Sequence, residues 1–415
     1  MQDYKELYKL YEAYRSSGRV LDMSRGKPSP QQLDTMDLLL TAVTKSSDCF
    51  TEKGTDCRNY GALDGINETK RLFANMLGVD MNNVIVGGNS SLNFMYDTVA
   101  RAMLHGVVDG CKPWSKYDKI SFLCPVPGYD RHFAICEFFG INMISVPMDD
   151  KGPDMDMIES IVANDETVKG CWCVPKYSNP AGVTYSDEVV GRFAALKPAA
   201  KDFRVFWDNA YVLHDLTDHP DSLLEIFSEA QKFGNEDMFF EFASTSKITY
   251  PGAGVACIVS SRRNILRIID ELKYQTIGHD KINQLRHARV FKTYDDIVIQ
   301  MQKHTALIKP KFDTVYKVFD EMLEGCDVSW TKPNGGYFIC VTTPDGTAKR
   351  ITELCLQAGL KITPAGATHP YGINERDNII RIAPTFPSVD ELRDAAKLFC
   401  ICTRLAITEN YRKSI

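Results

Sequence analysis

The sequence predicts an α/β fold in which a mainly parallel sheet lies between helices, accompanied by a smaller α+β domain. Short apolar segments of strand length alternate with segments of helical periodicity from about residue 66 to residue 290. After residue 290 the pattern changes to a long helical segment, a few short strands and a final helix. The length of 415 residues allows two or three domains and a large buried core.

The sheet is expected from apolar segments that are mostly separated by helical patterns. The first, Val84-Ile85-Val86, lies between a helix that ends at Gly78 and a helix whose apolar face includes Leu92 and Met103. The other segments are Ile120 to Cys124, Met143 to Val146, Gly170 to Val174, Val205 to Trp207, Phe239 to Phe242 and Val255 to Ser260. Continuous apolar composition of this kind is typical of strands that are buried on both faces.

The smaller domain is expected to comprise residues 293–415, completed by residues 1–48, which leaves residues 49–292 as the large domain. Its helical pattern includes Gln300 to Leu323, its strands lie around 337–341 and 379–383, and its final helix follows Ser388. Tyr4, Leu7, Tyr8, Tyr11 and Tyr14 form a stripe at helical spacing. This stripe predicts an amphipathic N-terminal helix that packs on the rest of the chain or on another subunit.

Composition excludes several classes of protein. With 44% hydrophobic and 25% charged residues, the chain has the composition of an ordinary soluble globular protein. A net charge of -6 argues against a general binder of nucleic acid or of membrane surfaces. The segment Met1 to Leu7 is too charged for a signal peptide, and no apolar run has the length of a membrane span. We therefore expect a cytoplasmic protein that binds neither nucleic acid nor membranes.

The 13 cysteines are scattered through apolar segments, as in Cys171-Trp172-Cys173 and Cys400-Ile401-Cys402. They form no CxxC pair. This distribution predicts reduced, mostly buried thiols, in keeping with a cytosolic compartment, and neither disulfides nor a zinc site.

Polar residues follow the ends of several predicted strands, which is where open parallel sheets bind ligands. After Val84-Ile85-Val86, the segment Gly87-Gly88-Asn89-Ser90-Ser91 opens a helix. It offers free backbone N–H groups, hydroxyls and the positive end of a helix dipole to an anion. Asn89 and Ser90 are also ordinary helix-capping residues, so this segment alone is weak evidence for a binding site.

Two further strand ends supply an amide and a carboxylate. Asn179 lies in a turn shaped by Pro180 and Gly182, although turn formation alone explains the same residues. Asp208 directly follows the strand that ends at Trp207, and Tyr211 comes three residues later. A carboxylate at the mouth of an apolar strand is costly unless it has a positive partner. Helix capping is the alternative explanation for Asp208, and core packing for Tyr211.

A fourth strand, Phe239 to Phe242, leads to Ser244, Ser246 and Lys247. A surface lysine on a Ser/Thr-rich loop is the ordinary explanation of such a segment, since lysines are mostly exposed. The other strand ends already supply an anion site, an amide and a carboxylate. Because Lys247 follows a strand of the same sheet as these groups, it is predicted to be the reactive amine of the protein.

Pyridoxal 5'-phosphate is the ligand that requires all of these groups together. Its aldehyde needs a lysine, its ring nitrogen a carboxylate, its phosphate a helix N-terminus with hydroxyls, and its phenolic oxygen an amide and a phenol. The residues that fill these roles, in that order, are Lys247, Asp208, Asn89 with Ser90, and Asn179 with Tyr211. We therefore expect this cofactor and no metal site.

Several motifs follow one another along nearly the whole chain: Pro127-Gly128-Tyr129, Asn179-Pro180-x-Gly182, Asp208-x-x-Tyr211, Ser244-x-Ser246-Lys247 and Arg381. This ordered set resembles the fold type I, class I aminotransferases. Longer segments are similar to the divergent aspartate aminotransferase subgroup described as MocR-like or type Ic. Among them are Arg25-Gly26-Lys27-Pro28-Ser29, Asn59-Tyr60-Gly61, Tyr129-Asp130-Arg131-His132 and Arg381-Ile382-Ala383-Pro384.

The resemblance implies roles for three further residues. Tyr129 would stack on the cofactor ring, and Tyr60 would reach the cofactor phosphate of a neighbouring subunit, which requires a homodimer. Arg381 would hold the substrate α-carboxylate with its planar fork, a geometry that lysine cannot match. A surface salt bridge is the alternative for Arg381, but its place inside the apolar run Ile379-Ile380-Arg381-Ile382 argues against simple exposure.

The implied reaction converts L-aspartate and 2-oxoglutarate into oxaloacetate and L-glutamate. A cation is needed to select a side-chain carboxylate, and Arg131 is the first candidate, followed by Arg25 beside Gly26. The Gly26 loop can also present backbone N–H groups to a carboxylate, and either arginine could instead pair with a structural carboxylate. The alternatives are an aminotransferase for aromatic amino acids, kynurenine or alanine, and a carbon-sulfur lyase, because the same cofactor residues serve all of these enzymes.

One position departs from the family pattern. Many class I aminotransferases have an arginine two residues beyond the Pro-Gly that follows the lysine, where it pairs with the phosphate. Here Pro251-Gly252 is followed by Ala253-Gly254. This phosphate contact is expected to be absent or to come from elsewhere.

Overall fold

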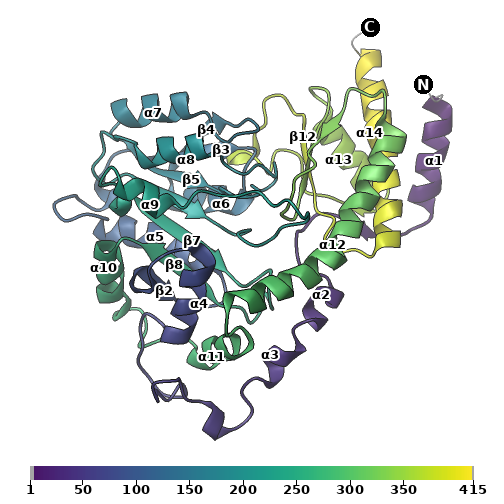
Figure 1. The fold of residues 1–415 in the computed structure, drawn as a ribbon. Coiled ribbons are helices and arrows are strands. Elements are labelled where there is room, and N and C mark those ends of the chain that lie inside the picture. Colours follow the sequence, from purple (N-terminus) through teal and green to yellow (C-terminus); the bar gives the residue numbers. More distant parts are fainter. Residues whose placement is uncertain (1–3, 414–415) are drawn as a thin grey trace.

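The structure, a computed structural model, describes residues 4–413 and has a seven-stranded sheet between layers of helices (Figure 1). Residues 1–3, part of the segment for which no signal peptide is expected, lie outside the described residues, as do residues 414–415. In sheet order the strands are β2 (Val84–Val86), β8 (Ala256–Ser260), β7 (Phe239–Ser244), β6 (Arg204–Asp208), β5 (Val168–Cys173), β3 (Ser121–Val126) and β4 (Asn142–Pro147).

The prediction of a mainly parallel α/β sheet is confirmed. Neighbouring strands from β7 to β4 in sheet order pair in parallel, whereas β8 runs antiparallel to both β2 and β7. Because β8 runs against both of its neighbours, β2 has the same direction as β7. The carboxyl ends of β2, β5, β6 and β7 therefore lie along one edge of the sheet.

Helices cover both faces of this sheet because successive side chains of each strand point to opposite faces. On β6, Phe206 packs in one hydrophobic cluster with α5, α6 and α10, whereas Val205 and Trp207 pack in another with α7, α8 and α9. The helices are α4 (Asn67–Leu77), α5 (Ser91–His105), α6 (Asp130–Phe139), α7 (Met155–Asn164), α8 (Asp187–Ala194), α9 (Ile226–Gln231), α10 (Arg262–Leu272) and α11 (Lys281–Val290).

A separate hydrophobic cluster joins the two ends of the chain. Leu7 and Tyr11 of α1 are buried in it together with residues of α12, α13 and α14, and Figure 1 shows α1 beside α14. The elements here are α1 (Tyr4–Ser16), β1 (Leu21–Asp22), α12 (Tyr294–Leu323), β9 (Ser329–Trp330), β10 (Ile339–Thr342), α13 (Ala348–Gln357), β11 (Leu360–Lys361), β12 (Ile379–Ile382) and α14 (Val389–Lys413). The prediction that the N-terminal helix packs through an aromatic stripe is thus confirmed for Tyr11, whereas Tyr8 is 44% exposed.

Two small sheets and two short helices complete the fold. Strands β12, β10 and β9 form an antiparallel sheet in that order, and β1 pairs in parallel with β11. Helices α2 (Pro30–Asp34) and α3 (Asp37–Thr41) connect β1 to the large sheet region, and α2 contacts α12. Residues 25–28, between β1 and α2, line a cavity that Arg381 of β12 and strand-end residues of the large sheet also line.

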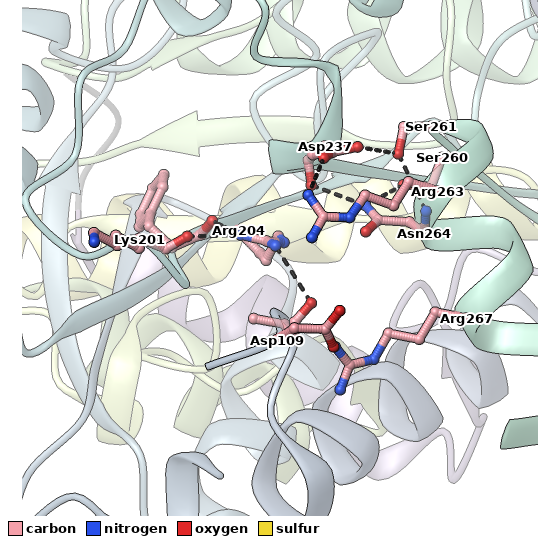
Figure 2. A network of polar contacts seen from close by, with 11 residues as sticks. Asp109, Lys201, Arg204, Asp237, Ser260, Ser261, Arg263, Asn264 and Arg267 are labelled. Atoms are coloured by element: carbon pink, nitrogen blue, oxygen red, sulfur yellow. Dashed lines mark hydrogen bonds and ion pairs between the residues drawn. The ribbon is translucent and has the colours of Figure 1, made fainter. Parts of the chain in front are cut away.

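Charged side chains form hydrogen bonds at the edge of the large sheet where its parallel strands begin (Figure 2). Arg204, at the start of β6, is buried and donates to the backbone carbonyls of Phe203 (2.7 Å) and Val107 (3.5 Å). Burial lowers the pKa of Arg204 to about 10. Asp237 accepts a hydrogen bond from Ser261 at the end of β8. These contacts belong to the edge opposite the strand ends that were predicted to bind the ligand.

All thirteen cysteines are free, and all except Cys111 and Cys326 are buried, as predicted. Burial raises the pKa of the thiols of Cys124, Cys173 and Cys257 well above the ordinary value. Such thiols are poor nucleophiles. Within residues 4–413, no helix combines the length and the apolar composition that crossing a membrane requires.

Candidate active site

A cavity of about 500 Å³ opens where the parallel strands end. The predicted residues that line it are Arg25, Gly26, Asn89, Ser90, Tyr129, Arg131, Asn179, Asp208, Tyr211, Ser244, Ser246, Lys247 and Arg381. Tyr60 does not line this cavity, and its side chain is 79% exposed. Residues at the ends of the parallel strands thus line one cavity although their segments are far apart in the sequence.

Lys247 stands in a turn directly after β7. The turn is closed by a hydrogen bond from the Thr245 backbone N–H to the Val255 carbonyl (2.8 Å). The Lys247 Nζ atom lies 4.6 Å from the centroid of the Tyr211 ring. Burial lowers the pKa of Lys247, while the negative charge of Asp208 partly opposes this shift. A lysine with a lowered pKa has a larger fraction of neutral amine, which is the form that acts as nucleophile and base.

Asp208, the last residue of β6, is buried and bonds to a histidine of α6. Its Oδ2 atom lies 3.0 Å from Nε2 of His132, and the His132 ring stacks on Trp172 with 4.4 Å between ring centroids. The other oxygen, Oδ1, has no hydrogen-bond partner among the described residues. A buried carboxylate oxygen without a partner is costly. This oxygen is therefore suited to accept a hydrogen bond from a ligand, for example from a protonated ring nitrogen.

His132 was not among the predicted site residues, although it belongs to the motif Tyr129-Asp130-Arg131-His132. Tyr129 is the N-cap of α6, and its ring contacts the His132 ring edge-on at 5.0 Å. Residues three apart on a helix are neighbours on its surface. The spacing of Tyr129 and His132 was therefore a signal that could have identified His132 once Asp208 required a partner.

Arg381 of β12 is 7% exposed and makes several bonds inside the site. Its Nη1 atom donates to Oδ1 of Asp130 (2.9 Å) and to Oδ1 of Asn179 (3.2 Å), and its Nε atom donates to Thr363 (3.1 Å). The Arg381 side chain is thus oriented on one side by an ion pair with Asp130. Asp130 was not among the predicted site residues. The Nη2 atom has no hydrogen bond to any residue in the described range and is available to an anionic ligand.

Asn179 and Tyr211 are both buried and keep donor groups for a ligand. The Oδ1 atom of Asn179 already accepts from Arg381, so its Nδ2 group is the part that remains to donate. Burial raises the pKa of Tyr211 well above its ordinary value, and the nearby Tyr129 and Asp208 act in the same direction. The Tyr211 phenol therefore stays protonated and can donate a hydrogen bond.

Hydroxyl groups line the part of the cavity next to the start of α5. Ser90 caps this helix by accepting a hydrogen bond from the Leu92 backbone N–H (3.3 Å). Ser244 donates to the Ser246 hydroxyl (3.0 Å), which donates to the Asn89 carbonyl (3.0 Å). The helix N-terminus and these hydroxyls together form the kind of environment in which phosphate groups bind.

The loop after the lysine carries no cation at the position of the family arginine. Gly254 packs closely, since a Cβ atom there would lie 3.1 Å from the Thr245 hydroxyl. The backbone carbonyl of Gly254 accepts a hydrogen bond from Asn283 (2.8 Å). The cationic side chains that line the cavity are Arg25, Lys27, Arg131, Lys247 and Arg381. No residue of the segment 251–254 contributes to that set.

Arg25 and Arg131 are exposed at the cavity wall, and neither makes an ion pair with a residue in the range 4–413. The predicted alternative, in which they pair with a structural carboxylate, is not seen among these residues. Lys27 also lines the cavity, with its ammonium group 3.9 Å from the centroid of the Phe386 ring. Gly26 lies against Phe338, whose ring would be 2.5 Å from an added Cβ. The close approach of this loop to Phe338 therefore depends on glycine at position 26.

Solved structures that resemble this chain over nearly its whole length include aminotransferases. The crystal structure of an α-aminoadipate aminotransferase from Thermus thermophilus, complexed with N-(5'-phosphopyridoxyl)-L-leucine, matches 97% of this chain and 95% of its own with a TM-score of 0.77. At 16% identity this similarity shows the shared fold. The crystal structure of an aspartate transaminase from Corynebacterium glutamicum matches 98% of this chain and 96% of its own, with a TM-score of 0.95 and 42% identity.

Sequence comparison leads to the same group of proteins. An aspartate aminotransferase from Corynebacterium glutamicum is 42% identical over 409 residues, which cover 98% of this chain and 94% of the relative. The family model described as aspartate amino-transferase matches residues 2–414. The chain therefore belongs to the aspartate aminotransferase family and is an aminotransferase.

Proposed function

We propose that this chain catalyses the pyridoxal-phosphate-dependent transamination of L-aspartate with 2-oxoglutarate, giving oxaloacetate and L-glutamate. The observation that carries the proposal is the unpaired Oδ1 atom of buried Asp208 in the cavity that also contains Lys247 and Arg381. A carboxylate for a ring nitrogen, an amine for an aldehyde and a guanidinium for a carboxylate are the groups that this reaction requires. The choice of aspartate is supported by the Corynebacterium glutamicum relative named as an aspartate aminotransferase.

The residues proposed to bind the cofactor are those expected from the sequence. Asp208 would hold the ring nitrogen, Tyr129 would stack on the ring, and the phenolic oxygen would accept from Asn179 and Tyr211. The phosphate would lie at the α5 N-terminus among the hydroxyls of Ser90, Ser244 and Ser246 and the Asn89 side chain. When bound, the cofactor supplies an aldehyde for Lys247 and a protonated ring that withdraws electrons from the substrate Cα.

Lys247 would act as the acid and base of the reaction. Its Nζ atom would take the proton from the Cα atom of the amino acid and would then give it to a second carbon atom of the bound reactants. The lowered pKa of Lys247 favours the neutral amine that the first of these steps requires. Arg381 would hold the α-carboxylate of the substrate, and Asp130 and Asn179 would keep its guanidinium in place.

The side-chain carboxylate of aspartate would bind to Arg131 or Arg25 at the cavity wall. Both lack a protein carboxylate within 4 Å among the described residues, so their charge is available to a ligand. The backbone of Gly26 would contribute N–H groups on the same side. We name Arg131 as the first candidate because it lies two residues after Tyr129, the proposed stacking residue.

We further propose a cytoplasmic homodimer of the MocR-like, type Ic subgroup. Tyr60 is 79% exposed, and exposed Ile277 lies next to the neighbouring residue Gly61, whose backbone N–H donates to the Ile277 carbonyl (3.2 Å). Exposed apolar side chains that gather in this way mark contact surfaces, in keeping with a Tyr60 that reaches the neighbouring subunit. The free cysteines are in keeping with the cytoplasm.

The domain division also stays as proposed, with residues 49–292 as the large domain and residues 1–48 and 293–415 as the smaller one. Three of the hydrophobic clusters support it, whereas a fourth joins Met36 and Leu39 to residues of the large domain. One cluster contains Leu7 and Tyr11 together with many residues beyond position 308, whereas two others consist of residues between 85 and 272. Limited proteolysis that releases a fragment beginning near residue 49 or ending near residue 292 would support these boundaries.

The first test is an absorbance spectrum of the purified protein. Bound pyridoxal phosphate gives a band in the visible or near ultraviolet, and borohydride should fix the cofactor covalently to Lys247, as peptide mapping can establish. A Lys247→Ala protein that still turned over amino acids would refute the mechanism.

A second test addresses the substrate. With 2-oxoglutarate as acceptor, aspartate, alanine, kynurenine and aromatic amino acids are compared by kcat/KM. Aspartate should exceed the others by at least about tenfold, the ratio that about 1.4 kcal/mol of extra transition-state binding produces. A higher kcat/KM for kynurenine or an aromatic amino acid would favour that alternative, and release of pyruvate from cysteine-type substrates would favour a carbon-sulfur lyase.

A further inference from the structure

We propose that Tyr337 is a positioning residue for Lys247, and that Gln32 and Ser29 fix the direction of the hydrogen bond through which it acts. The Tyr337 phenol lies 3.4 Å from the backbone carbonyl oxygen of Lys247. The same phenol oxygen lies 3.0 Å from Nε2 of Gln32. The inference rests on the proposed function, because it takes Lys247 to be the amine that binds the cofactor.

The chemistry of the chain of bonds determines which atom donates at each step. The Ser29 backbone N–H can only donate, so the Gln32 atom 3.0 Å from it must be the amide oxygen. The opposite end of the amide is then the NH₂ group, which donates to the Tyr337 oxygen. The phenol proton is consequently left for another acceptor, and the Lys247 carbonyl is the acceptor within reach. The direction therefore runs from Ser29 through Gln32 and Tyr337 to Lys247.

Burial makes this chain of bonds specific. Ser29 and Gln32 are 0% exposed and Tyr337 is 1% exposed. Water therefore does not readily replace a lost hydrogen-bond partner, and a buried polar atom left without one is costly. Ser29 directly follows Arg25, Gly26, Lys27 and Pro28, which line the cavity. The chain of bonds thus connects the loop that carries the proposed substrate cations with the backbone of the reactive lysine.

Tyr337 contacts the lysine at two places. Its phenol reaches the Lys247 backbone, and the centroid of its ring lies 5.9 Å from the Lys247 Nζ atom. The centroid of the Tyr211 ring lies 4.6 Å from the same nitrogen. Two aromatic rings and one phenol hydrogen bond therefore restrict where the amine can point. For a group that must move a proton between two carbon atoms, orientation contributes directly to the rate.

Other titratable groups lie on the same side of Lys247. His214 is buried, with its ring 5.6 Å from both the Tyr211 and Tyr337 rings, and burial lowers its pKa well below the ordinary value. Burial also lowers the pKa of His304, to about 4. Asp208 supplies the nearby negative charge. Both histidines are neutral at neutral pH, so the phenol faces Lys247 without a competing cation.

The test compares wild-type holoenzyme with Tyr337→Phe and Gln32→Glu. The first variant removes the phenol hydroxyl and keeps the aromatic ring near Lys247. The second keeps the acceptor for Ser29 and turns the donor into a second acceptor, so that the phenol proton is drawn away from Lys247. For both variants we expect kcat to fall roughly tenfold with the KM for aspartate changed less than about twofold. The visible absorbance of the bound cofactor should also titrate at a pH shifted by about half a unit.

Tyr11→Phe is the matched control. Tyr11 is a buried phenol of the same hydrophobic cluster and donates to a backbone carbonyl, that of Leu354, at 3.3 Å. It lies on α1, away from the cavity lining, so its loss should lower stability in a similar way without changing kcat or the titration of the cofactor absorbance. A Tyr337→Phe enzyme that behaves like Tyr11→Phe in both readouts would overturn the proposal.

The double variant Tyr337→Phe/Gln32→Glu separates one connected chain from two independent effects. If Gln32 acts through Tyr337, the double variant should have the kcat of Tyr337→Phe alone. Fully additive losses would overturn the directed chain of bonds. Failure of the proposed function looks different, because wild-type protein would then lack the cofactor absorbance or borohydride would label a residue other than Lys247.

Discussion

The His132 Nε2 atom lies 3.0 Å from Oδ2 of Asp208, and this contact leaves the second oxygen of Asp208 as the one that faces a ligand. The histidine is itself held by stacking on Trp172. The direction of the carboxylate is therefore determined by a ring that is packed in the core, before any ligand binds. A preorganised charge of this kind is more effective than one that must turn toward its partner during the reaction.

Asp208→Asn should nearly abolish transamination. The change keeps the size of the side chain but removes the negative charge that would hold a proton on the cofactor ring nitrogen. We expect kcat/KM for aspartate to fall by at least about a hundredfold, which corresponds to roughly 2.7 kcal/mol of transition-state stabilisation. Steady-state kinetics check this, with cofactor content measured in parallel. Activity close to that of wild type would exclude Asp208 from this role.

His132→Phe should give a smaller loss. Phenylalanine retains an aromatic ring for stacking on Trp172 but cannot bond to Asp208, so the carboxylate loses its orienting partner. We expect kcat to fall roughly tenfold, with the KM for aspartate little affected. Kinetics of the variant at saturating aspartate provide the measurement. A loss as large as that of Asp208→Asn would instead indicate that His132 takes part in the chemistry directly.

Arg381→Lys should weaken both substrates together. An ammonium group cannot reproduce the planar fork that bonds Asp130 and Asn179 while leaving a nitrogen for the substrate. We expect kcat/KM for aspartate and for 2-oxoglutarate to fall by about a hundredfold each, since both carry the α-carboxylate. Loss for only one of the two substrates would contradict a role in binding the shared carboxylate.

Arg131→Ala should discriminate between substrates. Removal of this cation should lower kcat/KM for aspartate roughly tenfold or more and leave that for alanine within about twofold, because alanine has no side-chain carboxylate. Arg25→Ala, measured in the same way, is the matched comparison. Equal effects on aspartate and alanine would remove Arg131 from the proposed role and direct attention to Arg25.

Glu241→Gln should change how stability depends on pH. Burial raises the pKa of Glu241 from 4.5 to about 8, although Asn209 donates to its carboxyl group (2.9 Å) and opposes the shift. Between these values the folded protein keeps a proton that the unfolded chain loses, so wild-type stability falls as pH rises through this range. The variant lacks this loss and should gain thermal stability relative to wild type between about pH 5 and about pH 8. Scanning calorimetry at both pH values provides the measurement, and equal slopes would indicate that Glu241 is ionised in the fold.

Much of the fold was predictable because its strands are apolar and short, and because a buried parallel sheet imposes that composition. The direction of β8 was not, since Val255 to Ser260 reads the same whether the strand runs parallel or antiparallel. Asp208 and Lys247 could be recognised because Asp208 ends β6 and Lys247 lies three residues after the end of β7. The position of a polar residue at a strand end is a local property of the sequence.

The contacts between distant segments were not predictable in the same way. Asp130 pairs with Arg381 across 251 positions of sequence, and Gln32 reaches Tyr337 across 305. Nothing in the residues next to Asp130 or Gln32 specifies such a partner, which depends on how the antiparallel sheet and the N-terminal segment meet the large sheet. His132 is intermediate, since its helical spacing from Tyr129 was visible but its partner was not.

The antiparallel direction of β8 has a consequence for the lysine. The chain leaves the sheet through β7, passes Lys247 and returns through β8 at the same edge, with the Thr245 N–H bonded to the Val255 carbonyl and the Val255 N–H to the Thr245 hydroxyl. The segment is thus a short loop whose two ends are joined, and the entropy of closing it is lost when the sheet forms. Little conformational freedom remains to be lost when the lysine engages a ligand, so more of the binding energy is available for the reaction itself.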